Sequence, residues 1–157
     1  MSGIDETPTG LKPLARVRQR LAQRLYTVRD IIRLTGMTRR QVMHLSDIGL
    51  VEPTLRDPEA KTGRPAYFYS AVEVLKALVV AELRRTNLSP GEVQQVARNL
   101  REHGVQLFES AAYLLTDGHS VYYAFSETDV VDIHKNHRQR LLLVPIHEQV
   151  VKLEEVA

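Results

Sequence analysis

The stretch at residues 27–51 decides the fold, and it reads TVRDIIRLTGMTRRQVMHLSDIGLV. Its apolar residues recur at three- and four-residue steps on both sides of Gly36, which is typical of two amphipathic helices. Thr27 and Thr38 stand where helix N-caps are expected, and Gly36 and Gly49 stand where a left-handed residue would end each helix. Two short helices joined by a glycine-containing turn predict a helix-turn-helix.

The first turn of the second predicted helix bears on function. An ordinary helical hairpin in a small core would show the same apolar spacing. Here, however, Arg39, Arg40 and Gln41 follow Thr38 directly. In a helix-turn-helix this turn enters the major groove of DNA, where arginine and glutamine form paired hydrogen bonds with base edges. The composition of the turn therefore favours a helix that reads DNA.

The next segment, between Val51 and Ser70, predicts a β-hairpin wing. It contains three prolines and ends in the aromatic run at residues 67–69. Prolines disfavour a helix, and aromatic side chains favour a strand. A hairpin over this segment would carry Lys61 and Arg64 at its tip, where both could reach a backbone phosphate.

Further helices are expected on both sides of this region. Residues 14–25 show a basic amphipathic pattern, and such a helix could pack on the body, lie along a phosphate backbone or stay loose. Residues 70–86 are strongly apolar. Ser89, followed by proline and then by Glu92, forms a capping box that opens another helix, which we expect to end at Gly104.

The order and spacing of these features resemble the DNA-binding domain of MerR-type winged helix-turn-helix regulators. The resemblance extends from Tyr26 to His103 and is most specific in the turn at residues 35–40, the exit at residues 49–51 and the wing-to-helix join at residues 69–70. It implies a homodimer that binds an inverted repeat, with one recognition helix per half-site in the major groove and the wings on flanking phosphates. It also implies a promoter site beside RNA polymerase.

The resemblance also implies which side chains contact DNA. They lie at the start of the second helix and in the wing: Thr38, Arg39, Arg40, Gln41, His44, Lys61, Arg64 and Tyr67. Two positions depart from the family pattern. Where the family usually has an arginine followed by two aromatic residues, this chain has Met-His-Leu at positions 43–45. Where the family has a wing arginine, this chain has Tyr67, and the nearest arginine is Arg64. We therefore expect a reduced phosphate grip, compensated by the basic N-terminal helix, the wing tip or a partner.

The last third of the chain has a different character. Residues 1–104 carry 17 basic and 11 acidic side chains, whereas residues 105–157 carry 4 and 8. Strands are expected at 113–116 and 121–125, joined at Asp117-Gly118, with further strands at 130–133 and 141–146 and an inward-facing helix at 147–156.

A module of this size buries little apolar surface, so we expect it to pack on something. The candidates are a second copy across a dimer axis, another protein at a sheet edge, and a small molecule between its aromatic side chains. The predicted fold class is α+β: a winged helix-turn-helix followed by a β-rich module with a terminal helix. The predicted parts are an N-terminal arm at 1–25, a DNA-binding domain at 26–104 and a dimerisation or interaction domain at 105–157.

Composition narrows the function classes. The chain has 157 residues and no cysteine, which excludes disulfides and thiolate chemistry. No apolar run could span a membrane, and the opening residues lack the order of a secretory signal, which predicts a cytoplasmic, nucleoid-associated protein. No catalytic motif stands out, so neither an enzyme nor a cofactor is predicted. His134 and His137 share a helical spacing but lack further ligands, so no metal is predicted either.

These observations favour a dimeric, sequence-specific transcription regulator. The weakened phosphate grip and the acidic last third support an alternative, in which an antitoxin or adaptor uses the winged helix together with a protein partner. A third possibility is an excisionase-like architectural protein that binds and bends DNA.

Overall fold

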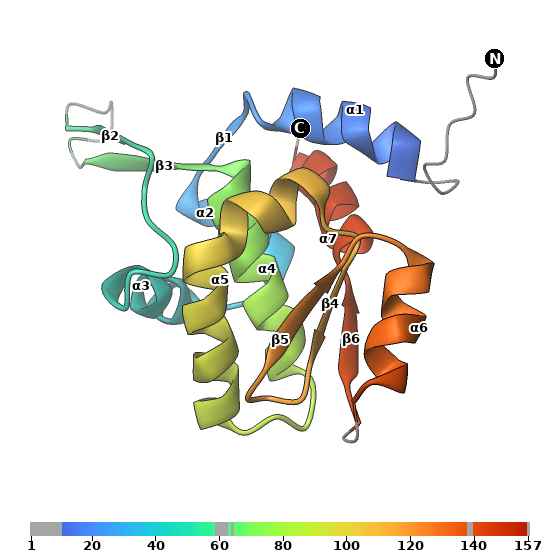
Figure 1. Ribbon diagram of the computed structural model, residues 1–157. Helices are drawn as coiled ribbons and strands as arrows, with labels where there is room; N and C mark the ends of the chain where they lie inside the picture. The colour runs from blue at the N-terminus through green and yellow to red at the C-terminus, as the bar shows by residue number, and fades with distance from the viewer. Residues whose placement is uncertain (1–10, 59–62, 64, 138–139, 157) are drawn as a thin grey trace, which may run out of the picture.

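The computed structural model describes residues 11–58, 63, 65–137 and 140–156. The structure combines helices with two small antiparallel sheets, one of which projects from the body beside α3, and this makes the fold α+β as predicted (Figure 1). In chain order the elements are α1 (Leu11–Leu21), β1 (Leu25–Tyr26), α2 (Val28–Thr35), α3 (Arg39–Asp47), β2 (Leu55–Asp57), β3 (Ala66–Ser70), α4 (Ala71–Arg84), α5 (Pro90–Ser110), β4 (Tyr113–Thr116), β5 (Val121–Ala124), α6 (Glu127–Lys135), β6 (Leu142–Pro145), α7 (Ile146–Lys152) and the 3-10 turn η1 (Leu153–Val156).

The helix-turn-helix forms where the sequence predicts it. The hydroxyl of Thr27 accepts from the N–H of Asp30, and the Asp30 carboxylate accepts from the N–H of Thr27, which closes a capping box on α2. Gly36 and Gly49 have φ of 72° and 74°, a left-handed backbone that glycine adopts without strain. The predicted start of α2 and both glycine turns are therefore confirmed.

The wing is a real hairpin within a three-stranded sheet of order β1-β3-β2. Its pairing is antiparallel, with Leu55 opposite Phe68 and Arg56 opposite Tyr67. The short strand β1 pairs with the other edge of β3, so that Tyr26 lies opposite Tyr69. The sheet thus connects the strand before the helix-turn-helix to the wing behind it.

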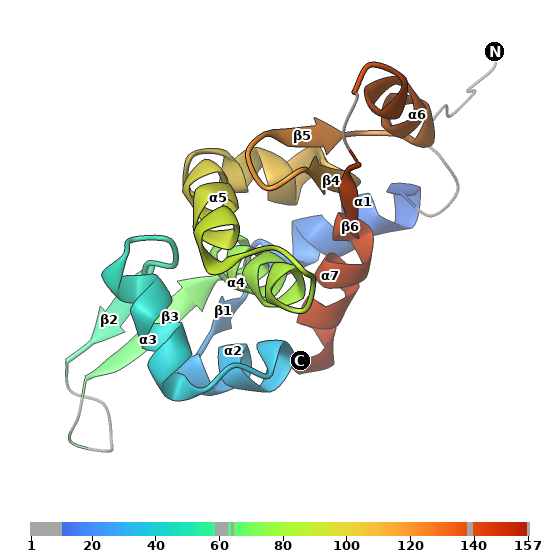
Figure 2. The same ribbon diagram turned by 90° about the horizontal axis from the view of Figure 1, so that it is seen from below.

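Helix α4 lies in the centre of the molecule and packs along α5 (Figure 2). The predicted end of α5 at Gly104 is wrong, because the helix continues to Ser110. Gly104 is buried against α4, and a Cβ atom at this position would lie 2.8 Å from Cδ of Lys76. The glycine therefore allows two helices to approach closely instead of ending one of them.

The second sheet has the order β5-β4-β6 and is covered on both faces. Leu114 and Val144 point into the main core with α4, while Leu115 packs in a smaller cluster with partly buried residues of α6. The strand expected at 130–133 is wrong, since these residues lie in α6. Ser126 caps that helix by accepting from the N–H of Asp129, and this cap with the three-residue apolar spacing outweighs the β-propensity of the segment.

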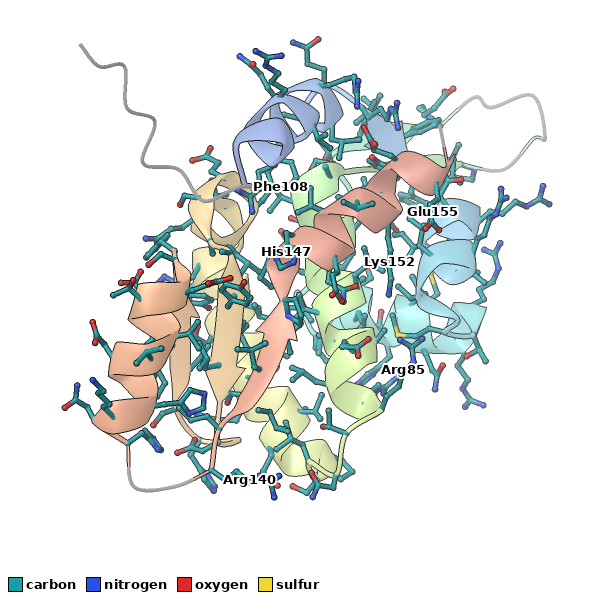
Figure 3. The ribbon with its side chains drawn as sticks, turned by 90° about the vertical axis from the view of Figure 1, so that its right-hand side faces the viewer. Arg85, Phe108, Arg140, His147, Lys152 and Glu155 are labelled. Carbon is teal, nitrogen blue, oxygen red and sulfur yellow. The ribbon has the colours of Figure 1, made fainter. Side chains whose placement is uncertain are left out.

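The terminal helix expected at 147–156 forms as α7 followed by η1, but Val151 is exposed instead of facing inward. Val150 and Leu153 are fully buried and belong to one apolar cluster that begins at Leu21. The apolar surface of the last third is thus covered largely by α1, α4 and α5 of the same chain (Figure 3).

The basic N-terminal segment packs on the body, one of its three expected arrangements. Helix α1 contacts α7 and α5 but ends at Leu21, so it is shorter than the helical pattern at residues 14–25, and Leu25 lies exposed in β1. Arg18 of this basic helix is buried. Among the described residues, no helix has the length and apolar character needed to cross a bilayer.

Candidate nucleic-acid interface

Helix α3 presents a polar outer face at one side of the molecule. Its inner face is fixed by Val42 and Leu45, which are buried in the main core. The wing projects from the same side, whereas α6 lies at the opposite side (Figures 1 and 2). The outer face of α3 and its N-cap carry five of the predicted DNA contacts together with two further residues, all exposed: Thr38, Arg39, Arg40, Gln41, Met43, His44 and Asp47.

The two arginines occupy an electrostatically unfavourable place. Arg39 and Arg40 are the first two residues of α3, where the helix dipole is positive and an acidic residue would be favourable. Neither guanidinium pairs with a carboxylate in the part of the chain that the structure describes. Helix stability therefore does not explain these two side chains, and their charges are available to an external anion.

Thr38 and Gln41 form the N-terminal cap of α3. The Thr38 hydroxyl accepts from the N–H of Gln41 at 3.1 Å, and Oε1 of Gln41 accepts from the N–H of Thr38 at 2.9 Å. This arrangement confirms Thr38 as the N-cap. It also leaves the amide nitrogen of Gln41 as the group facing solvent, because its oxygen is engaged in the cap.

His44 lies one turn further along the same helix. Its side chain borders a cavity of about 320 Å³ between α3, α4 and α5, whose walls also include Leu45 and Ile48. The imidazole thus stands at the edge of the exposed face of α3 and does not lie at its centre.

The wing adds a basic side chain that sequence reasoning missed. The guanidinium of Arg56 on β2 lies 5.8 Å from the ring centre of Tyr67 on β3, a cation–π distance. Tyr67 is itself exposed. The two residues meet because the hairpin register places position 56 opposite position 67. The sequence alone does not fix this register, so it did not reveal the pair. The predicted contacts Lys61 and Arg64 lie outside the described residues.

Beneath the wing, Tyr69 anchors β3 to the core. Its side chain is buried, and burial raises the pKa of the Tyr69 phenol, with the neighbouring Tyr67 adding to the rise. The rise reflects the place of the phenol against the apolar cluster.

The turn between α2 and α3 is held from behind by α4. Nη2 of Arg85 donates to the carbonyl oxygen of Thr35 at 3.1 Å, and Arg84 Nη1 lies 3.8 Å from Sδ of Met37 (Figure 3). Within the turn, the Thr35 hydroxyl donates to the carbonyl of Ile31 and accepts from the N–H of Met37. These contacts fix the direction in which α3 leaves the turn.

The histidines of the last third do not gather into a metal site. His137 lies 3.3 Å from the carboxylate of Asp117, and His134 is exposed on α6. Over the described residues, no three His, Cys, Asp or Glu side chains converge as metal ligands would.

Comparison with known families decides the identity of the helix-turn-helix region. Residues 26–100 match the family model described as MerR HTH family regulatory protein. These residues form a MerR-family domain. The match supports DNA binding and transcription regulation as the role of this domain. A comparison with curated proteins found no match to the chain. In the MerR-family domain described here, α2 and α3 are the helix-turn-helix and β2 and β3 the wing.

Proposed function

We propose that this chain is a homodimeric, sequence-specific regulator that places α3 in the major groove of an inverted-repeat operator and its wing on the flanking phosphates. The observation that carries the proposal is the pair Arg39 and Arg40. Their guanidinium groups, which form no ion pair with any described residue, begin α3 at its positive end, where they oppose the helix dipole and match the chemistry of guanine edges and phosphates.

The wing supports the same mode of binding. Stacking on Tyr67 restricts the guanidinium of Arg56 on the side of the molecule that carries α3. We propose that Arg56 holds a backbone phosphate, together with Lys61 and Arg64, which the sequence predicts to lie at the wing tip. Phosphate contacts position a protein on DNA, whereas base contacts specify the sequence. We therefore propose that the wing fixes the position of the protein along the DNA, and that Arg39, Arg40 and the amide nitrogen of Gln41 contact the bases.

We propose that residues 26–104 are the DNA-binding unit and that residues 105–157 provide contacts to a second copy. Several large apolar side chains of the last third remain exposed although the core beneath them is complete: Val105, Phe125, Val131, Leu143 and Val151. Exposed apolar surface of this kind favours association. An inverted-repeat operator requires two copies related by a twofold axis, which this association would supply.

The decisive experiment is selection of bound oligonucleotides from a random pool by the purified full-length chain. We expect an inverted repeat whose half-site spacing reports the distance between two α3 helices. Arg140→Ala is a matched control for Arg39→Ala, because Arg140 is an exposed arginine in the loop before β6, away from α3 (Figure 3). Recovery of no motif, or equal loss of binding in both variants, would contradict the proposal.

Two further measurements separate this function from the alternatives. Sedimentation of the protein on its selected operator should show two chains per repeat. A stoichiometric foreign protein that co-purifies at low salt, with no selected motif, would favour the adaptor or antitoxin. If the chain is a DNA-binding regulator, the logarithm of its operator association constant should fall linearly with the logarithm of the salt concentration, with a slope of about −0.9 for each phosphate neutralised.

A further inference from the structure

A second candidate site lies away from the DNA-binding side. A cavity of about 350 Å³ opens between α1, the first turn of α4 and the last turn of α5. Phe108 marks its place at the end of α5, beside α1 (Figure 3). Its walls combine apolar and polar side chains, which include Arg18, Ala22, Ser70, Val72, Phe108 and Glu109.

The unusual member of this wall is Arg18. The residue is only 7% exposed, and its Nη2 donates to the carbonyl oxygen of Ala111 at 2.5 Å. Among the described residues, its buried Nε has no hydrogen-bond partner and no carboxylate forms an ion pair with its guanidinium. Burial lowers the pKa of Arg18, which reflects the cost of removing the guanidinium from water. A buried charge with unmet donors is destabilising unless an anion completes it.

Capping of α5 explains only part of this arrangement. Ala111 is the C-cap residue of α5, so one N–H of Arg18 satisfies a carbonyl at the negative end of that helix. A guanidinium has five N–H donors in a planar fork suited to a carboxylate. The cap therefore leaves Nε unexplained, and it does not account for the open space beside the side chain.

The opposite wall of the cavity is formed by the start of α4. Ser70 is the N-cap residue of α4, but its side chain makes no capping hydrogen bond. The acidic residue of that first turn, Glu73, is engaged by Lys76 Nζ at 2.6 Å and by the backbone N–H of Glu52. The positive end of a 14-residue helix thus borders the same space as Arg18, and such an end favours an anion.

We propose that this cavity binds a small organic monocarboxylate with an apolar body. The carboxylate would bond to Arg18 and lie near the start of α4, and the apolar body would pack on Ala22, Val72 and Phe108. A single charge fits best, because there is one guanidinium and the Glu109 carboxylate at the wall would repel a dianion. This proposal does not rest on DNA binding.

Benzoate is a suitable probe, with benzamide as its neutral isostere and inorganic phosphate as the dianion. Calorimetric titration of the full-length chain should show saturable benzoate binding. Arg18→Met should weaken that binding at least about tenfold, which corresponds to about 1.4 kcal/mol. Arg16→Met is the matched control, because Arg16 is an exposed arginine on the same helix, and it should bind benzoate as the unaltered chain does.

A second measurement does not depend on the variant folding. In an NMR titration of the unaltered chain, benzoate should shift the amide signals of Ala71 and Val72 and the Nε–H signal of Arg18. Equal benzoate affinity in Arg18→Met, benzamide binding as tightly as benzoate, saturable phosphate binding without benzoate binding, or shifts confined to other residues would each overturn the proposal. So would the absence of benzoate binding at a concentration of about 50 mM, which corresponds to a free energy weaker than about −2 kcal/mol.

Discussion

Arg85 and Thr35 are joined across fifty positions by a hydrogen bond of 3.1 Å from Nη2 to the backbone carbonyl oxygen. Thr35 is the last residue of α2, and Arg85 is the C-cap residue of α4. The bond satisfies a carbonyl that the end of α2 would otherwise leave without an intrahelical partner. It also fixes the helix-turn-helix to the central helix of the molecule.

Replacing Arg85 should therefore affect both stability and DNA binding. We expect Arg85→Ala to lower the free energy of unfolding by about 1 kcal/mol, the usual net value of such a bond. Operator affinity should fall as well, because the turn then loses its support. Glu82→Gln is the control: it removes only the exposed ion pair with Arg85, worth about 0–1 kcal/mol, and keeps the bond to Thr35. Urea unfolding and operator titration measure the two effects, and an equal loss of operator affinity in both variants would argue against a role for the Thr35 bond.

Substitution of Arg39 or Arg40 should reduce DNA binding without reducing the stability of the fold. Alanine at either position should leave the free energy of unfolding unchanged or slightly raised, since it removes a positive charge from the positive end of α3. Operator affinity should fall by about 1–3 kcal/mol, with relaxed base preference at one position, if that arginine reads a base. Unfolding curves and repeated oligonucleotide selection check both results. A parallel loss of stability and affinity would mean that the arginines serve the fold.

Gln41 offers a test of the cap on α3. Gln41→Ala removes the acceptor for the N–H of Thr38 and should lower the free energy of unfolding by about 0.5–1.5 kcal/mol, the usual net value of one hydrogen bond. Gln41→Glu keeps an acceptor and adds a charge that the helix dipole favours, so its stability should match or exceed that of the unaltered chain. Thermal unfolding of the two variants distinguishes them. The cap would be unimportant if both variants melted alike.

The Tyr26 hydroxyl ties the strand before the helix-turn-helix to the end of the chain, because it donates to the carbonyl oxygen of Leu153 at 3.2 Å. Tyr26→Phe should cost about 1 kcal/mol in unfolding free energy, since a buried carbonyl loses its donor. Tyr67→Phe is the matched control, because the Tyr67 hydroxyl makes no hydrogen bond within the described part of the chain. Chemical denaturation should show a loss in the first variant only.

Asp117 should make stability depend on acid pH. Burial alone would raise the pKa of its carboxyl, but backbone N–H groups of Ser120 and His119, with the charge of His137, outweigh burial and hold the pKa below its ordinary value of 3.8. A lowered carboxyl pKa contributes stability at pH values above 3.8, and this contribution is lost as the pH falls through the folded value.

Asp117→Asn should flatten this acid dependence, because its amide oxygen can accept the same N–H bonds but does not titrate. Urea unfolding at neutral pH and at about pH 3 gives the comparison. Asp132→Asn, on the exposed face of α6, should retain the dependence of the unaltered chain. An unchanged slope in the first variant would show that other carboxylates carry it.

Much of the candidate site could be predicted from the sequence because it is local. A cap joins residues three positions apart, and a glycine turn depends on one backbone angle. Thr38 and Gly36 therefore predict the start of α3 without reference to the rest of the chain. The consecutive residues after Thr38 then fall on the first turn. The Arg56–Tyr67 pair was missed because it requires the strand register, which the sequence does not fix.

Errors arose where a distant contact outweighs a local preference. The sequence suggests that Gly104 ends a helix. In the structure a glycine is needed there because the Lys76 side chain lies too close for a Cβ atom. Residues 130–133 include β-branched side chains, which favour a strand. They are nevertheless helical, because Ser126 caps α6 and because Val130 and Ile133 pack against Leu115 of the sheet. The size of the last third predicts that it packs on another surface, and α1, α4 and α5 of the same chain supply much of that surface.

The sequence by itself determined the helix-turn-helix, its wing, its family and the basic start of α3, because these follow from interactions within a few residues. Only the tertiary structure decided that Arg85 supports Thr35 and that Arg18 is buried at the end of α5, beside a cavity. Arg18 and Ala111 are 93 positions apart, and their meeting depends on how α1 and α5 pack on a shared core. The free energy of that packing is summed over the whole apolar cluster, so no short segment of the chain encodes it.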